Sequence, residues 1–206
     1  MADVSVPELE LRPAYPIRTE RLLLRPLTED DIEALLAYRS IPEICRYVPF
    51  EPMDHAEIRA RLAGPFATTE LTGEGQALTL GAVLAGTGEL IGDVVLFLHS
   101  RKHRAGEIGY ILNADFAGHG YATEAARALL ALGFDGLGLH RIVARIDERN
   151  EASARVARRL GMRQEARLVR NEWFKGEWST ELDFAMLAEE WPEHRDGRPG
   201  DRLLPA

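Results

Sequence analysis

The chain has 206 residues, of which 46% are hydrophobic and 28% charged, with a formal net charge of −8. This length and balance fit one globular domain and exclude a collagen-like or low-complexity chain. The acidic charge disfavours nucleic acid as a partner. No apolar run reaches the roughly 18 residues of a membrane span, and the single Cys45 cannot form an internal disulfide. We therefore expect a soluble, cytoplasmic protein with neither a nucleic-acid nor a membrane partner.

Prolines divide the chain into a middle and two ends. Eight of the eleven prolines lie at or before Pro65, and the next one is Pro192. Because proline is poorly tolerated inside helices and central strands, the proline-free middle should hold most of the sheet and its helices. We predict an N-terminal tail over residues 1–16, a single domain over 17–191 and a C-terminal tail over 192–206.

Hydrophobic patterning predicts seven strands and four helices. Apolar runs bounded by turn residues indicate the strands, and apolar residues at helical spacing indicate the helices. The predicted strands are 21–27, 77–84, 90–98, 107–112, 141–146, 168–174 and 179–187, the last two flanking a Lys175-Gly176 turn. The predicted helices are 28–40, 54–62, 121–134 and 151–160. This order predicts a mixed α/β sheet with helices on its faces.

The segment DFAGHGYATEA, residues 115–125, joins a strand to a helix through a loop with two glycines. The first turn of a helix leaves backbone N–H groups without internal partners, and the helix dipole adds positive charge there. Gly118 and Gly120 would let a bulky anion approach the backbone closely. The loop predicts a phosphate or diphosphate site; the alternative is an ordinary tight loop before a helix.

The glycine pattern of this loop excludes two common anion-binding motifs. A dinucleotide-binding fingerprint would need a third glycine where the chain has Thr123. A P-loop would need a Gly-Lys-Ser/Thr sequence, which does not follow. A different anion-binding family is required.

Four sequence blocks follow one another along the chain: RTERLLLRPLTEDD near the start, EIGYIL before the loop, GYATEA at the helix entry, and NEASARVARRLGM later on. Together they resemble the GNAT superfamily of acyl-CoA N-acyltransferases, and within it the RimJ/RimL-like branch. The resemblance covers residues 18–187. It implies a GNAT fold with a mixed, mostly antiparallel sheet of about seven strands, splayed between the fourth and fifth, and helices on both faces.

The resemblance implies acetyl-CoA as the cosubstrate and no metal. Its diphosphate would lie on the backbone N–H groups of Gly118, His119, Gly120, Tyr121 and Ala122. The hydroxyl of Thr123 would add a further donor. Its pantetheine arm would pair with the end of the preceding strand, at Ile111, Leu112 and Asn113. Asn150, which also suits the N-cap of the last predicted helix, would contact this arm. The family's Gln or Arg at the start of the loop is Asp115 here, which leaves the backbone positions unaffected.

Three residues are candidates for the proton transfers. Many GNAT enzymes place a tyrosine acid four residues before the glycine that ends the last helix, and this position is Ala157. Ser153 is then the best replacement as the acid for the departing thiolate. For the base, Glu172 matches the RimL-like branch and Glu107 matches other GNAT enzymes. We favour Glu172 slightly, and one of the two can instead be a solvated strand residue.

These inferences predict an acetyl-CoA-dependent N-acetyltransferase that moves an acetyl group to a primary amine by direct attack in a ternary complex. The acceptor would be a protein N-terminus or a small-molecule amine. The alternative function is a non-catalytic, GNAT-like module that binds acyl-CoA as a sensor or scaffold. An exposed β-edge near the C-terminus would allow pairing in a homodimer.

Overall fold

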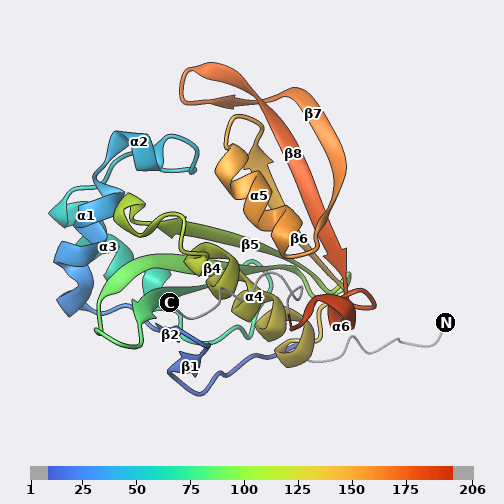
Figure 1. The fold of residues 1–206 in the computed structure, drawn as a ribbon, viewed down its shortest axis with the longest axis horizontal. Helices are drawn as coiled ribbons and strands as arrows, with labels where there is room; N and C mark the ends of the chain where they lie inside the picture. The colour runs from blue at the N-terminus through green and yellow to red at the C-terminus, as the bar shows by residue number, and fades with distance from the viewer. Residues whose placement is uncertain (1–8, 197–206) are drawn as a thin grey trace.

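A computed structural model describes residues 9–196, which form one eight-stranded sheet covered by helices (Figure 1). The strands lie in the order β1-β2-β3-β4-β5-β6-β8-β7. Their bounds are β1 Ile17–Arg18, β2 Leu22–Arg25, β3 Ala77–Leu84, β4 Leu90–Ser100, β5 Ala105–Leu112, β6 Arg141–Asp147, β7 Arg163–Phe174 and β8 Glu177–Leu187. Only β5 and β6 run parallel, and the other neighbours are antiparallel. The expected mixed, mostly antiparallel sheet is confirmed.

The α-helices of the described chain are α1 Ile32–Arg39, α2 Pro42–Cys45, α3 His55–Ala63, α4 Tyr121–Ala131, α5 Glu151–Arg159 and α6 Trp191–His194. Short 3-10 turns cover Glu29–Asp31, Pro65–Ala67 and Ala114–Phe116, and a π-helical turn, Leu132–Gly136, extends α4. The four predicted helices correspond to α1, α3, α4 and α5. The four-residue α2 and α6 are too short to show helical periodicity in the sequence.

The sheet contains one strand more than expected. The additional strand, β1, has two residues, which is too short to give an alternating pattern. In the structure the predicted strand 168–174 begins earlier, at Arg163. The sequence did not indicate the added residues because they are mostly exposed and polar and carry no apolar signal.

The pairing between β5 and β6 ends after three residue pairs. The register joins Ala105–Glu107 to Arg141–Val143, although β5 continues to Leu112 and β6 to Asp147. We call residues 108–112 and 144–147 the unpaired stretches of β5 and β6. This geometry is consistent with the splay expected between these two strands.

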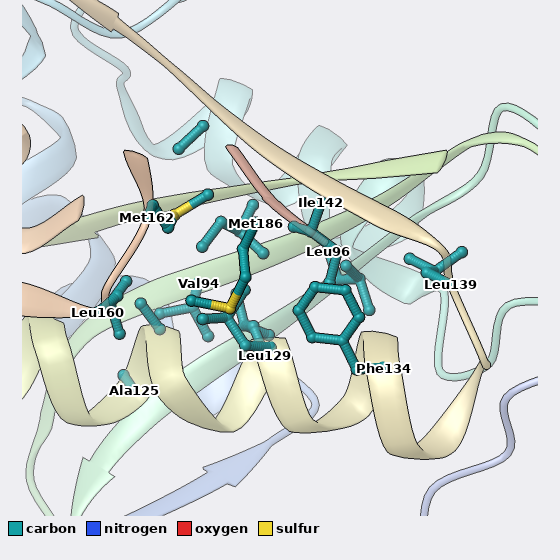
Figure 2. Close-up of a cluster of buried hydrophobic side chains, with 14 of the residues drawn as sticks. Val94, Leu96, Ala125, Leu129, Phe134, Leu139, Ile142, Leu160, Met162 and Met186 are labelled. Carbon is teal, nitrogen blue, oxygen red and sulfur yellow. The ribbon is translucent and has the colours of Figure 1, made fainter. Parts of the chain in front are cut away.

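Two buried clusters lie on opposite faces of the sheet. Successive side chains of a strand point to opposite faces, and Ile108 and Ile111 of β5 accordingly belong one to each cluster. Figure 2 shows the cluster on the α4 face, where Leu129 lies close to Val94 and Leu96 of β4. The other cluster contains residues of α1 and α3. Helices therefore cover both faces, as expected.

Parts of both predicted tails lie against the domain. Leu9 and Leu11 are buried in the larger cluster, and Leu11 pairs with Leu71 in an isolated bridge. At the other end α6 runs from Trp191, the last residue of the predicted domain, into the predicted tail, where Arg195 donates to Asp135 at 2.7 Å. Residues 1–8 and 197–206 of these tails lie outside the described residues. Within the described chain, no helix combines the length and apolarity needed to cross a membrane.

A buried ion pair joins α1 to β4. Arg39 donates from Nε and Nη2 to the two carboxylate oxygens of Asp93, at 3.0 and 2.6 Å, and both side chains are 4% exposed. Tyr38 donates its hydroxyl to the same carboxylate at 2.6 Å. Burial, together with the Asp93 charge, raises the pKa of the Tyr38 hydroxyl, which therefore remains a donor. The guanidinium of Arg39 also lies over the rings of Phe50 and Phe66, so this pair fixes α1 and the loops beside it.

Removing the acid of this pair should destabilise the protein strongly. We expect Asp93→Ala to lower the free energy of unfolding by about 3–5 kcal/mol, because Arg39 would stay buried without a counter-charge. The matched control, Glu57→Ala, breaks an exposed pair with Arg61 and should change stability by less than about 0.5 kcal/mol. Chemical denaturation measures both, and equal effects would contradict a structural role for the buried pair.

Candidate active site

The loop between β5 and α4 presents an uncapped helix N-terminus. Gly118 and Gly120 have φ angles of 84° and 81°, in the left-handed region that favours glycine, and Gly120 is the N-cap of α4. The N–H of Glu124 donates to the Gly120 carbonyl at 3.1 Å, so the N–H groups of residues 120–123 precede the helical hydrogen-bond ladder. A methyl group added to Gly118 would meet nothing within 4 Å. The backbone is therefore open to a ligand at this point.

Thr123, in the first turn of α4, carries a polar atom that fits an anion site. The residue is 6% exposed, and its hydroxyl has no hydrogen-bond partner among the described residues. An unpaired buried hydroxyl costs stability, and a phosphate oxygen would satisfy it. The helix N-terminus and this hydroxyl together suit the diphosphate of coenzyme A. We call residues 118–123 the diphosphate loop.

A cavity of about 340 Å³ lies between the unpaired stretches of β5 and β6. It is lined by Glu107 and Ile111, from one face of β5, and by Ile108 and Tyr110, from the other face. Because both faces contribute, the cavity reaches from one side of the sheet to the other. Its walls include Asn150 and Ser153 at the start of α5, and Tyr47, Val48 and Phe50 from the segment after α2.

Glu107 lies in the cavity wall and already has two partners on the same oxygen. Its Oε2 accepts from Nη1 of Arg145 at 2.9 Å and contacts Nε2 of His99 at 2.8 Å. The side chain of His99 is 41% exposed and stacks on Phe97, another residue of the cavity wall. The pair Glu107–His99 thus connects the cavity to solvent.

Asn150 and Ser153 lie together at the N-terminus of α5. The side chain of Asn150 accepts from the Ser153 N–H at 3.1 Å and caps the helix. The hydroxyl of Tyr110 donates to the Ser153 carbonyl at 3.0 Å, so β5 and α5 are joined inside the cavity. Burial raises the pKa of Tyr110. Ala157, at the position of the family's usual tyrosine, is fully buried in the core.

Glu172 lies apart from this group. It is exposed on β7, opposite Ser179 of β8, and does not line the cavity. Its hairpin ends at the predicted Lys175-Gly176 turn, where Nζ of Lys175 donates to the carbonyls of Cys45 and Phe50 at 2.7 and 2.6 Å. The hairpin tip is therefore tied to the end of α2 and to the segment after it, beside the cavity.

The structure adds polar residues that the motifs did not indicate. His99 and Tyr110 join the cavity group through their contacts with Glu107 and Ser153, which no local sequence pattern reveals. Glu181 of β8 lies opposite Asp147 at the end of β6, and burial and the neighbouring Asp183 raise its pKa. In residues 9–196 no cluster of three or more His, Cys, Asp or Glu side chains is arranged to hold a metal ion.

Comparisons with known proteins identify the family. Residues 21–163 match the acetyltransferase (GNAT) domain, and the chain belongs to this family. It is 32% identical over 175 residues to the uncharacterized N-acetyltransferase YnaD of Bacillus subtilis (strain 168), a match covering 85% of this chain and 98% of that protein. These findings confirm the predicted class: the protein is an N-acetyltransferase whose cosubstrate is acetyl-CoA.

Solved structures agree with this assignment. An acetyltransferase of the GNAT family from Bacillus anthracis is 32% identical and aligns with a TM-score of 0.75, covering 84% of this chain and 99% of that one. The structure of RimL, a ribosomal L7/L12 alpha-N-protein acetyltransferase in complex with coenzyme A, shares the fold at 21% identity. Its TM-score is 0.73, over 84% of this chain and 98% of that one. This likeness is one of fold.

Substitutions of Asn150 should report its capping role directly. We expect Asn150→Ala to lower the free energy of unfolding by about 1 kcal/mol, because the Ser153 N–H loses its acceptor. Asn150→Asp keeps an acceptor at the N-cap and should retain nearly the original stability. Chemical denaturation of both variants tests this, and an equal loss in the two would show that capping is not what the side chain contributes.

Proposed function

We propose that this protein transfers the acetyl group of acetyl-CoA to a primary amine, by direct attack of the amine while both substrates are bound. The observation that carries the proposal is the cavity between the unpaired stretches of β5 and β6, lined from both faces of the sheet. A donor and an acceptor entering from opposite sides would meet inside it. Their juxtaposition would supply much of the rate enhancement.

In this proposal acetyl-CoA supplies an activated acetyl group, and the chain holds it through backbone donors. The diphosphate loop would bind the diphosphate, with the Thr123 hydroxyl as a further donor. The end of β5 at Ile111 and Leu112, together with the following Asn113 and with Asn150, would hold the pantetheine arm. The N–H of Asn113 already donates to the Ile91 carbonyl of β4 at 2.9 Å. Since N–H groups alternate in direction along a strand, the N–H of Leu112 is the proposed donor to the thioester carbonyl.

We propose Glu107 as the base, which reverses the slight preference for Glu172 drawn from the sequence. Glu107 lines the cavity, whereas Glu172 is exposed on the hairpin outside it. The carboxylate would take the proton from the attacking ammonium, directly or through a water molecule. His99, at 2.8 Å and open to solvent, would pass this proton out of the cavity. Arg145 would keep the carboxylate in place.

Ser153 is the proposed acid that protonates the departing thiolate. Its main chain is fixed at both ends, because Asn150 accepts from its N–H and Tyr110 donates to its carbonyl. A tyrosine hydroxyl is protonated at neutral pH, and burial raises the pKa of Tyr110 further, so it remains a hydrogen-bond donor. Tyr110 would thereby hold the first turn of α5, which contains Ser153, against β5.

The proposed acceptor is the primary amine of a protein N-terminus or of a small molecule. A volume of about 340 Å³ is near the lower end for ligand pockets. The cavity would therefore admit the amine end of an acceptor, with the remainder lying outside.

The proposal includes a homodimer, because edge strand β7 carries the exposed side chains of Val169 and Trp173.

A turnover screen tests the proposed activity. Acetyl-CoA is incubated with peptides and small amines, and released thiol is measured. We expect thiol release that depends on both the protein and a primary amine. Coenzyme A binding in calorimetry without thiol release across the panel would instead support the alternative acyl-CoA sensor or scaffold.

The two candidate bases are separated by a pair of matched variants. We expect Glu107→Gln to lower kcat about 100-fold, because the ammonium loses its proton acceptor. Glu172→Gln should leave kcat and the pH–rate profile nearly unchanged, since that carboxylate is exposed outside the cavity. The reverse pattern would overturn the assignment to Glu107 and restore Glu172.

A further inference from the structure

One arginine from the start of the domain reaches into the diphosphate loop. Arg21 precedes β2, and its Nη1 donates to the carbonyl of His119 at 2.9 Å, across 98 residues of sequence. Its guanidinium also lies 4.7 Å from the ring centre of Tyr121. That ring stacks on His119, with 5.7 Å between centres. Arg21 therefore contacts the residues on both sides of Gly120.

The same arginine neutralises an acid in the first turn of α4. The carboxylate of Glu124, 14% exposed, accepts from the backbone N–H and from Nε of Arg21, each at 2.7 Å. It also accepts from the hydroxyl of Thr19 at 2.6 Å. The turn between β1 and β2 is thus bonded to the first turn of the helix that carries the diphosphate loop.

Both contacts of Arg21 have a consequence for anion binding. The His119 carbonyl and the Gly120 N–H belong to one peptide unit, and in a trans peptide these groups point in opposite directions. Because Arg21 holds the carbonyl, the Gly120 N–H points away from Arg21. In addition, an uncompensated Glu124 charge would repel a diphosphate bound one turn away. Arg21 cancels that charge and leaves the helix N-terminus attractive to anions.

We propose that Arg21 is a positioning residue for the diphosphate of coenzyme A, acting through the His119 peptide and Glu124. This inference rests on the proposed function, because it requires the diphosphate to lie on residues 118–123. It gives a physical role to Arg21 and Thr19 in the RTERLLL block and to Glu124 in the GYATEA block. The two sequence blocks thus form one structural unit, and the contacts within this unit hold the diphosphate loop in its conformation.

The test compares ligands with and without the diphosphate. The readouts are kcat, the KM for acetyl-CoA, and the inhibition constants of coenzyme A and of pantetheine, which lacks the diphosphate and the nucleotide. For Arg21→Met we expect the KM for acetyl-CoA and the inhibition constant of coenzyme A to rise about tenfold. The inhibition constant of pantetheine and kcat should stay near their original values, because the arm and the cavity are unchanged.

Two further variants separate positioning from charge and from general destabilisation. Arg21→Lys keeps the charge that compensates Glu124 but cannot also hold the His119 carbonyl, so it should show a smaller but measurable loss of coenzyme A affinity. Arg25→Met, the matched control, removes an arginine of β2 that is paired with Asp31 and does not contact the loop. It should leave the preference for coenzyme A over pantetheine unchanged.

The outcomes distinguish this inference from the proposed function. If the unaltered protein binds pantetheine as tightly as coenzyme A, the proposed diphosphate site is wrong. If the unaltered protein prefers coenzyme A and Arg21→Met retains that preference in full, the positioning role alone is overturned. Unaltered kinetics in Arg21→Lys would also overturn it, because charge alone would then suffice.

Discussion

The early end of the pairing between β5 and β6 is the constraint on which the rest of the structure depends. Three residue pairs hold the two strands together. Beyond Glu107 and Val143, the backbone groups of β5 and β6 are not paired with one another. Unpaired main-chain groups inside a sheet are costly unless another donor or acceptor meets them. Here the helices α4 and α5 begin on one side of this interruption, and the α1–α3 region lies on the other (Figure 1). The interruption gives the cavity its place and leaves a strand edge that an extended, hydrogen-bonding ligand can complete.

The elements with a strong local signal were the ones predictable from the sequence. Helix α4 has a glycine entry and an apolar face, and α5 has Asn150 and Gly161 at its ends, so both could be located closely. The family resemblance supplied the interruption of the sheet, which no local pattern of β5 or β6 contains. β1 and α6 are too short for any periodicity, and the burial of Leu9 and Leu11 depends on contacts with distant parts of the chain.

The candidate site was predictable to the extent that it is built from the backbone. The free backbone N–H groups of residues 120–123 follow from glycines and a helix start, which are local features. The side-chain partnerships are not local: Glu107 meets His99 and Arg145, and Arg21 meets His119, only because separate strands adjoin. An isolated glutamate in a sequence gives no indication of whether it will lie in a cavity wall, as Glu107 does, or on an exposed hairpin, as Glu172 does. Choosing between the two carboxylates as the proposed base therefore needed the fold.

The contact at the hairpin tip has a consequence for the lysine side chains of this enzyme, which are themselves primary amines. The chain contains only two lysines, Lys102 and Lys175, and Lys175 is the one beside the cavity. Its ammonium is bound to the carbonyls of Cys45 and Phe50, so it is occupied as a donor and is not presented as a nucleophile. In the proposed mechanism, the contact that fastens the hairpin therefore also keeps Lys175 from acting as an acceptor of the acetyl group.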